Sequence, residues 1–385
     1  MSLSFRRNII IPAGILYAMF STGRSLVFLV LAVCIIVSTL RLRYTSSNYE
    51  IAVKGPLPPA TYDDQRKKYI VYDCSKANSG VCGGWSKRMS GILSTLVISL
   101  LTKRRFLINH DKPCALENYL VPVNFDWRYN KSIQINTASS YQDLTAHNSK
   151  TLRKYLTGDL DINTYFHQDV SFLRMDWDFT EDFRKRPNIN SEIAWIQNLS
   201  YADMYKQLYY LLFKPSPLLE NALKDQNMHR SRPKLACAHV RVGDNPNMPG
   251  DDRRTRPRKD IIWHHFDKLN KDEYDIFIAT DSNSVKKRAK IRYPANIIDT
   301  PGRITHIEQQ YKFDPCEGFL KQLLDFYLLI SCDTLILTRS GFGMLAAYLR
   351  GTDSELYCLQ EGDLMPCSRY TLHHGQIYPG QMHAP

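Results

Sequence analysis

The sequence predicts an α/β protein with two Rossmann-like domains behind an N-terminal transmembrane anchor. Three observations favour this fold class: an uncharged apolar segment near the N-terminus, a strand-loop-helix-strand pattern that begins at Lys68, and three later strands that end in polar or glycine-rich loops. A chain of 385 residues is long enough for two such domains. Its content of 44% apolar and 23% charged residues is typical of a folded globular protein.

The apolar segment Ser25–Leu40 predicts the membrane anchor. It contains no charged residue, Arg24 precedes it, and Arg41 and Arg43 follow it. The segment is shorter than the roughly 20 residues that span a bilayer, but flanking arginine side chains can reach the headgroups and extend it. A cleaved signal peptide is the alternative; the late start of the apolar segment and the lack of a small-x-small cleavage site argue against it.

These features predict a single-pass type II membrane protein of the Golgi or the endoplasmic reticulum, with its catalytic part in the lumen. Residues 1–24 form the cytoplasmic tail, residues 25–40 the signal anchor, and the polar, proline-bearing residues 41–67 a stem. The sequons at Asn130 and Asn198 permit N-glycosylation in that compartment.

The cysteines agree with a lumenal location. Cys34 lies inside the expected anchor, and the remaining cysteines are even in number, as disulfides require. Cys237 and Cys332 lie in apolar runs, which predicts that these two are ordinary core thiols.

The first α/β domain is expected over residues 68–232. The strand-like "KKYIVYDCS" is followed by the glycine-bearing turn "GVCGGWSKRM", a buried helix over Ser90–Thr102 and a second strand, "RRFLINH". This β-loop-α-β unit predicts a parallel sheet. From about residue 115 the pattern is less clear, until two helices that follow one another, "YADMYKQLYYLLFK" and "SPLLENALKDQ".

The second domain is expected over residues 233–385 and is of the doubly wound, nucleotide-binding kind. Ligands of such sheets lie beyond the carboxyl ends of the strands. Three strands with polar or glycine-rich ends recur in this part of the chain: "KLACAHVRVGD", "YDIFIATDS" and "DTLILTRSGFG".

The first of these strand ends carries three ionisable groups. Arg241 offers a permanently charged planar fork that can bind a diphosphate through two hydrogen bonds. His239 lies two residues earlier on the same face of the strand, and Asp244 closes the turn. Alone, this motif would indicate a structural ion pair at the end of a strand.

The other two strand ends change that interpretation. Ser340, Gly341 and Gly343 precede a helix, where a hydroxyl and backbone N–H groups can hold phosphate oxygens. Asp281, after the middle strand, is a candidate orienting carboxylate. Together the three strand ends favour a site for a nucleotide diphosphate.

Three segments resemble the shared motifs of the GDP-fucose-dependent fucosyltransferase superfamily, which includes α1,2-, α1,6- and protein O-fucosyltransferases. "CGGWSKRMSGIL" is similar to the glycine motif of their first domain, and "LLFKPSPLLENAL" to the helix before the first shared motif. The resemblance covers about residues 69–128 and 207–350. The segments that carry the shared motifs are "HVRVGD", "IFIATDSNSVKKRAKIRYP" and "DFYLLISCDTLILTRSGFGMLAAYL".

The resemblance implies a GT-B fold and inverting, metal-independent transfer of fucose from GDP-fucose to a glycan or glycoprotein, with no separate cofactor. Arg241 would neutralise the β-phosphate of the leaving GDP, and His239 would help to fix the donor. Asp325 would accept the guanine N–H groups, because a buried carboxylate discriminates against a base without two donors. Further donor contacts are implied for Gly83 and Gly84 and for Ser340 and Gly341.

The sequence departs from the superfamily pattern in three places. Lys87 stands where the glycine motif usually has asparagine, and Val242 follows Arg241 where the α1,6 branch has a second arginine. No glutamate stands where that branch places its candidate base. Asp251 or Asp252 is the replacement catalytic base that we consider.

Two other functions compete. A metal-dependent GT-A glycosyltransferase would use Asp176 and Asp178 of "MDWDF" as oxygen ligands for Mn²⁺. A membrane-tethered pseudoenzyme would bind glycans without transferring sugar. The formal net charge of +12 would also suit a protein that binds nucleic acid, but the expected membrane anchor argues against that function. A P-loop is excluded because the spacing of the glycines and Lys87 does not match the P-loop motif. Zinc is not indicated, because the sequence contains no C-x-x-C or H-E-x-x-H motif.

Overall fold

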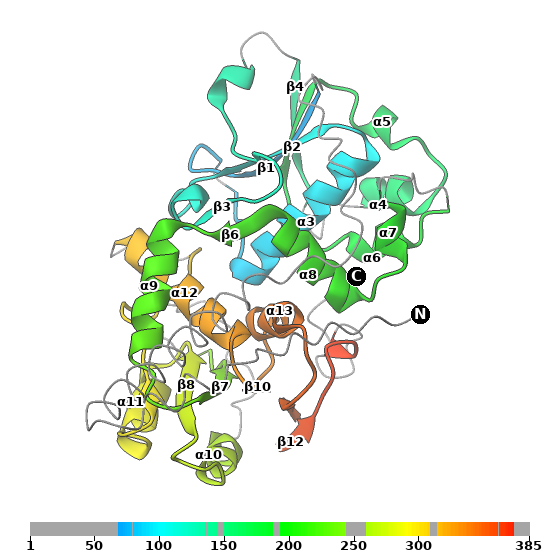
Figure 1. The fold of residues 1–385 in the computed structure, drawn as a ribbon. Helices are drawn as coiled ribbons and strands as arrows, with labels where there is room; N and C mark the ends of the chain where they lie inside the picture. Colours follow the sequence, from blue (N-terminus) through cyan, green and yellow to red (C-terminus); the bar gives the residue numbers. More distant parts are fainter. Residues whose placement is uncertain are drawn as a thin grey trace, which may run out of the picture. The chain divides into compact units, whose positions relative to one another are not determined.

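Two β-sheets with parallel cores organise the residues that the structure describes (Figure 1). The structure is a computed structural model, and these residues belong to one compact unit, Pro56–Pro385. The expected tail, anchor and stem lie outside the described residues, and none of the described helices is long and apolar enough to cross a membrane. The described residues are 68–78, 80–134, 138–144, 150–187, 193–243, 259–308, 314–360 and 362–372.

The first sheet consists of four parallel strands in the order β2-β1-β5-β4. The predicted β-loop-α-β unit is confirmed, because β1 and β2 pair in parallel with Tyr69 opposite Arg105. In the part of the chain without a clear pattern, the run "DVSFLRM" forms β5, one of the two inner strands. The bounds are β1 Tyr69–Cys74, β2 Arg105–His110, β4 Ser139–Asp143 and β5 Val170–Arg174.

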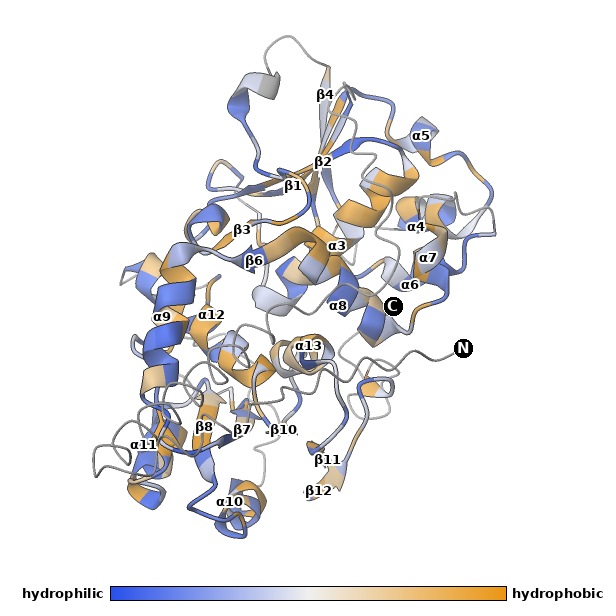
Figure 2. Ribbon diagram, in the orientation of Figure 1, coloured by the Kyte–Doolittle hydropathy of each residue, from blue (hydrophilic) through white to orange (hydrophobic). Residues whose placement is uncertain are grey.

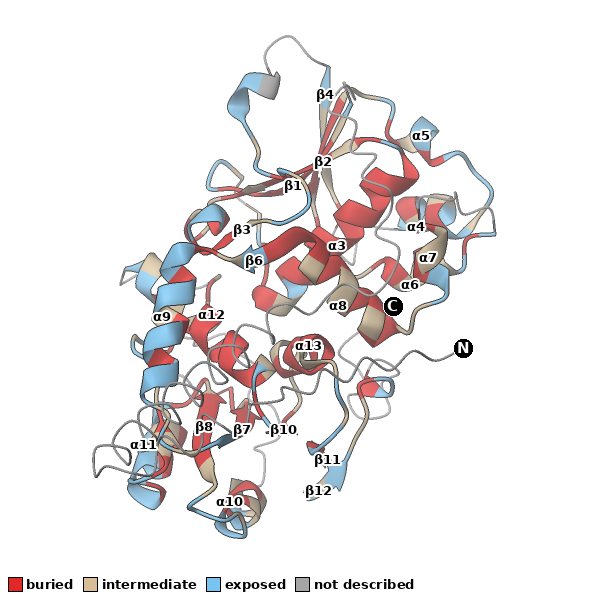
Figure 3. Ribbon diagram, in the orientation of Figure 1, coloured by how far each residue is buried: buried red, intermediate tan, exposed pale blue. Residues whose placement is uncertain are grey.

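Helix α3, Trp85–Leu101, packs against this sheet and is buried along most of its length (Figure 3). It is also largely hydrophobic (Figure 2), and two of its buried hydroxyls donate within the helix, Thr95 to the carbonyl of Gly91 and Ser99 to that of Leu96, both at 2.7 Å. It begins five residues before the predicted start, directly after Gly84 in extended conformation. A side chain at Gly91 would meet the carbonyl oxygen of Met175 at 2.0 Å, so glycine lets the chain after β5 lie against the helix.

The second sheet has the order β12-β11-β10-β7-β8-β9, and its strands are parallel except for β12, which runs antiparallel to β11. From β9 to β11 this is the doubly wound order, which reverses between β7 and β10. The three predicted strands are confirmed as β7, β8 and β10. The bounds are β7 Lys234–Val240, β8 Tyr274–Thr280, β9 Ile297–Ile298, β10 Thr334–Leu337, β11 Leu356–Gln360 and β12 Asp363–Pro366.

Alternating residues of the second sheet face two separate groups of helices. Along β7, Leu235 and Cys237 belong to the larger core cluster, while Ala236, Ala238 and Val240 belong to a smaller one. The helices α12 (Pro315–Ile330) and α13 (Gly341–Arg350) contribute to the larger cluster, and α10 (Lys259–Asp267) and α11 (Asn283–Arg292) to the smaller. The larger cluster also contains α3 and β1, so one core continues from the first sheet to one face of the second.

The remaining elements lie between residues 116 and 228. Helices α8 and α9 were predicted, and α8 ends before Pro215, as expected. Strands β3 and β6 form a two-stranded antiparallel sheet. The bounds are α4 Lys150–Thr157, α5 Ile162–Tyr165, α6 Thr180–Arg184, α7 Ala194–Gln197, α8 Tyr201–Leu212, α9 Pro217–Met228, β3 Leu120–Pro122 and β6 Phe213–Pro215, with short 3₁₀ helices at Leu116–Asn118 and Lys131–Gln134.

Four disulfides pair all eight cysteines that follow the expected anchor. The prediction that Cys237 and Cys332 are free core thiols is wrong: the last turn of α12 brings Cys332 beside β7, and the two are joined. Cys114 and Cys316 are 202 residues apart, and their disulfide links the first α/β part of the chain to α12. The other two disulfides, Cys74–Cys82 and Cys358–Cys367, close short loops.

A buried ion pair also joins the two parts of the chain. Arg88 of α3 is 0% exposed and donates from Nη2 to Oε2 of Glu308 at 2.8 Å. Its Nε donates to the carbonyl of Gly83 at 2.8 Å, and its Nη1 lies 3.0 Å from Nε2 of His110. Lys112 binds the other carboxylate oxygen of Glu308 at 3.0 Å. The pair therefore ties the glycine turn after β1 to the segment that precedes α12.

We expect replacement of both Cys114 and Cys316 by serine to lower the free energy of unfolding by about 2–5 kcal/mol. Without this cross-link the unfolded chain regains the entropy of a long loop. The measurement is denaturant unfolding under non-reducing conditions. The matched control is the double serine variant of Cys358 and Cys367, whose cysteines are only 9 residues apart. An equal loss in the two variants would contradict the expectation.

His110 makes stability depend on pH. Burial, and then the charge of Arg88, lower the pKa of His110 to about 3, whereas histidine in an unfolded chain titrates near 6.5. As the pH falls below about 6.5 the unfolded state binds a proton that the folded state does not, so stability is lost. We expect the unfolding free energy to fall between pH 7 and pH 5, and His110→Gln to reduce that fall. The exposed His229 at the end of α9 is the control, and His229→Gln should leave the pH dependence unchanged.

Candidate active site

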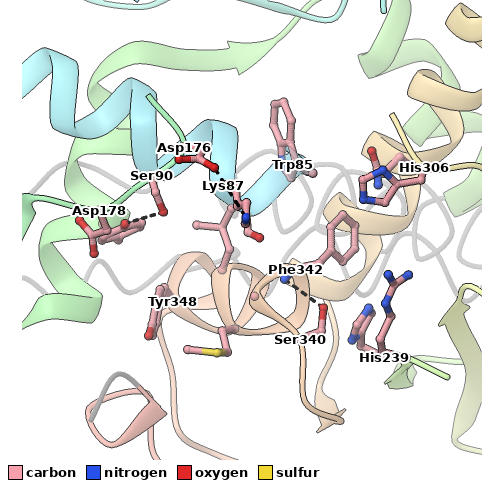
Figure 4. A pocket seen from close by; sticks show the side chains of 18 of the residues that line it. Trp85, Lys87, Ser90, Asp176, Asp178, His239, His306, Ser340, Phe342 and Tyr348 are labelled. Atoms are coloured by element: carbon pink, nitrogen blue, oxygen red, sulfur yellow. Dashed lines mark hydrogen bonds and ion pairs between the residues drawn. The ribbon is translucent and has the colours of Figure 1, made fainter. Parts of the chain in front are cut away.

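A cavity of about 900 Å³ lies where the carboxyl ends of both sheets meet. The loops after β1 and β5 contribute from the first sheet, and those after β7, β8 and β10 from the second. Residues 303–306 and side chains of α12 also line it, and so do side chains of α4, α6, α8 and α13. Figure 4 shows Asp176 and Lys87 on one side of the cavity and His239 and Ser340 on the other.

Arg241 follows β7 directly and reaches the cavity in a fixed orientation. Its Nη1 lies 3.0 Å from Oδ2 of Asp281, which follows β8. The same carboxylate accepts from the backbone N–H groups of Val242 at 2.8 Å and Gly243 at 2.7 Å. The backbone N–H of Arg241 donates to the hydroxyl of Thr338 at 2.8 Å. Asp281 thus orients the side chain of Arg241 and also holds the backbone turn that follows Arg241.

His239 lies on β7 behind Arg241 and is 6% exposed. Its ring centre is 5.4 Å from that of Phe342. Burial, and then the charge of Arg241, lower the pKa of His239 to about 3, so the ring is neutral at physiological pH. A side chain at Gly343 would meet Nδ1 of His239 at 3.0 Å, so Gly343 makes room for the histidine and does not line the cavity.

The first turn of α13 faces the cavity beside the first turn of α3. The hydroxyl of Ser340 accepts from the N–H of Phe342 at 3.3 Å and so caps the helix. A side chain at Gly341 would meet the hydroxyl oxygen of Ser86 at 2.7 Å. Backbone N–H groups at such a helix start attract anions, and Ser340 and Gly341 both line the cavity.

The glycine motif of the first sheet divides into two roles. Gly83 has a φ of 78°, a conformation that favours glycine, and it forms the turn whose carbonyl Arg88 holds. Gly84 lines the cavity, and a side chain there would meet Nε2 of His306 at 3.1 Å. The sequence analysis named neither His306 nor Glu308. Their segment, "GRITHIEQQ", has no periodicity that would have singled them out.

Asp325 lines the cavity from α12 but is already engaged. Its Oδ1 accepts from Nζ of Lys321 at 2.8 Å and also from the hydroxyl of Thr300, and its Oδ2 accepts from the same Nζ at 2.7 Å. Lys321 and Asp325 are one helical turn apart and both are buried. A ligand that binds Asp325 must therefore donate to lone pairs of the carboxylate oxygens that Lys321 and Thr300 do not use.

The remaining predicted residues fall into two groups. Asp244, Asp251 and Asp252 lie outside the described residues. Asp176 and Asp178 line the cavity and are engaged separately: Oδ2 of Asp176 lies 3.6 Å from Nζ of Lys87. Asp178 accepts from Thr180, at 2.9 Å from its backbone nitrogen and 2.6 Å from its hydroxyl, and from a tyrosine hydroxyl. Across the described ranges no group of three or more metal-ligating side chains is close enough to hold a metal ion.

No family model matches the sequence, and no curated protein matches it in sequence. Solved structures are similar in fold. A mutant of FUT1 from Arabidopsis thaliana, in complex with GDP, aligns with a TM-score of 0.55 at 14% identity, over 78% of this chain and 71% of that chain. NodZ α-1,6-fucosyltransferase soaked with GDP-fucose gives a TM-score of 0.49 at 13% identity, over 78% and 98% of the two chains.

POFUT1 in complex with GDP gives a TM-score of 0.42 at 10% identity, over 75% of this chain and 97% of that chain. Of these three likenesses, the one to FUT1 is close enough to define the architecture. The expected α/β architecture with parallel sheets is confirmed, and it is similar to the GT-B-like fold of FUT1.

Proposed function

We propose that this protein transfers fucose from GDP-fucose to a hydroxyl of a glycan or glycoprotein, with inversion and without a metal ion. One observation carries the proposal: Arg241, oriented by Asp281, shares a cavity with the start of α13 at the point where the strand order of the second sheet reverses. The fold shared with GDP-bound FUT1 supports the choice of nucleotide. In this proposal residues 233–385 bind the donor and residues 68–232 the acceptor.

The proposed roles follow from the charges at that point. As the bond between fucose and GDP breaks, negative charge grows on the β-phosphate. A fixed guanidinium stabilises that charge at no cost of reorganisation, and Arg241 is fixed by Asp281. The N–H groups at the start of α13 hold further phosphate oxygens. Asp325 accepts from guanine on the face that Lys321 leaves open.

The location follows as part of the same proposal: a type II membrane protein of the Golgi, or of the endoplasmic reticulum, anchored by Ser25–Leu40. The disulfides support a lumenal domain, because such cross-links persist in oxidising compartments. Asn130 and Asn198 are both exposed, as glycosylation would require.

The test is to purify the full chain in detergent and to measure binding and turnover of GDP-fucose, GDP-mannose and UDP-sugars, with and without EDTA. We expect GDP-fucose to bind, and to be consumed equally well in EDTA. Preference for a UDP-sugar that needs Mn²⁺ would support the metal-dependent alternative instead. GDP-fucose binding with no transfer to any glycan or protein would support the pseudoenzyme.

Arg241→Lys keeps the positive charge but loses the planar fork. We expect kcat to fall by a factor that corresponds to about 2–4 kcal/mol of transition-state stabilisation. The matched control is Arg232→Lys, because Arg232 also pairs with a buried aspartate, Asp275 at 3.2 Å, but at the opposite end of the sheet. An unchanged kcat in Arg241→Lys, or an equal loss in both variants, would remove Arg241 from its proposed role.

A further inference from the structure

In the first sheet two adjacent strands end at the cavity, and a carboxylate follows one of them. These strands, β1 and β5, are the inner strands of the order β2-β1-β5-β4 and run parallel to each other. The glycine turn follows β1, and Asp176 comes two residues after the end of β5. We propose that Asp176 is a catalytic base that takes the proton of the acceptor hydroxyl as that hydroxyl attacks fucose; the inference rests on the proposed fucosyl transfer.

The backbone holds Asp176 against the start of α3. The carbonyl of Met175 lies where a side chain at Gly91 would be, so the chain after β5 runs in contact with the helix. This contact brings Asp176 to Lys87 in the first turn of α3, with 3.6 Å between Oδ2 and Nζ. That turn meets the start of α13 through Ser86 and Gly341, so Asp176 faces, across Lys87, the side of the cavity where the phosphates are proposed to bind (Figure 4).

The carboxylate of Asp176 has capacity to accept a proton. Its side chain is 17% exposed, and its Oδ1 is buried without a hydrogen-bond partner among the described residues. Oδ2 is the oxygen left to face the cavity, 3.6 Å from Nζ of Lys87. The next residue, Trp177, also lines the cavity, where an indole face can pack against a sugar ring.

The other described carboxylates that line the cavity have partners of their own. Asp281 orients Arg241, Asp325 holds Lys321, and Asp178 accepts from Thr180 and Tyr201. On α6, Glu181 accepts from Arg184 at 2.9 Å, and Asp182 lies 3.6 Å from Nε of Arg153 of α4. Burial raises the pKa of Asp182, which makes it the second candidate. His239 also lines the cavity, but on the side of Ser340, where the donor is proposed to bind.

The acceptor oxygen forms a bond to the anomeric carbon of fucose while the bond from that carbon to the β-phosphate oxygen breaks. The electron pair leaves with GDP, beside Arg241. The proton of the acceptor hydroxyl moves to Oδ2 of Asp176, and solvent removes it after the product leaves.

The test uses the full chain, GDP-fucose, and as acceptors water, a panel of neutral glycosides and glycopeptides, and sodium azide. We expect Asp176→Asn and Asp176→Ala to slow GDP release with hydroxyl acceptors by about 10²–10⁴-fold, with GDP affinity and Tm unchanged. The acid limb of the pH–rate profile should disappear in both variants. Azide carries no proton to remove, so it should restore GDP release in Asp176→Ala and yield fucosyl azide, detected by mass spectrometry.

Asp169→Asn is the matched control. Asp169 lies at the other end of β5, also beside a lysine, Lys68 at 3.8 Å, and should leave the rate unchanged. Three results would overturn the role of Asp176 and leave the proposed function standing. They are a wild-type rate in Asp176→Asn, no rescue of Asp176→Ala by azide, and loss and rescue of activity in Asp182→Ala instead. A wild-type protein that fails to bind GDP-fucose would overturn the proposed function, and one that binds it but never releases GDP would overturn both.

Discussion

The buried pair of Arg88 and Glu308 is the interaction on which the site depends. A fully buried guanidinium without its partner leaves an uncompensated charge, which costs several kcal/mol, so the two side chains must stay together. Arg88 fixes the turn at Gly83, and Glu308 fixes the segment that carries His306 to the edge of the cavity. Because one residue comes from α3 and the other from the segment before α12, the pair sets how the ends of the two sheets face each other.

The two sheets place side chains of opposite charge at the cavity in a similar way. In each sheet two adjacent parallel strands open their carboxyl ends onto the cavity, β7 and β10 in the second sheet and β1 and β5 in the first. The second sheet places the cation Arg241 there, held by Asp281. The first sheet places the carboxylate Asp176 there, beside Lys87. A reaction in which one partner leaves as an anion and the other loses a proton needs both kinds of group.

Much of the second sheet could be predicted from the sequence, because buried parallel strands are short apolar runs bounded by polar residues. Strand β5 could not, because Ser171 interrupts its apolar run and its partners β1 and β4 lie far away in the chain. Asp176 was considered only as a metal ligand, since nothing in "MDWDF" shows that the two aspartates contact different partners.

The sequence by itself determined which groups stand at the strand ends, because residue type and two-residue alternation are local properties. It therefore identified Arg241, Asp281 and Ser340 as neighbours at one edge of a sheet. Only the tertiary structure decided which charges pair: Arg88 and Glu308 are 220 residues apart, and no local pattern connects them. The same holds for Cys237 and Cys332, whose apolar surroundings suit a thiol and a disulfide equally well until α12 packs on β7.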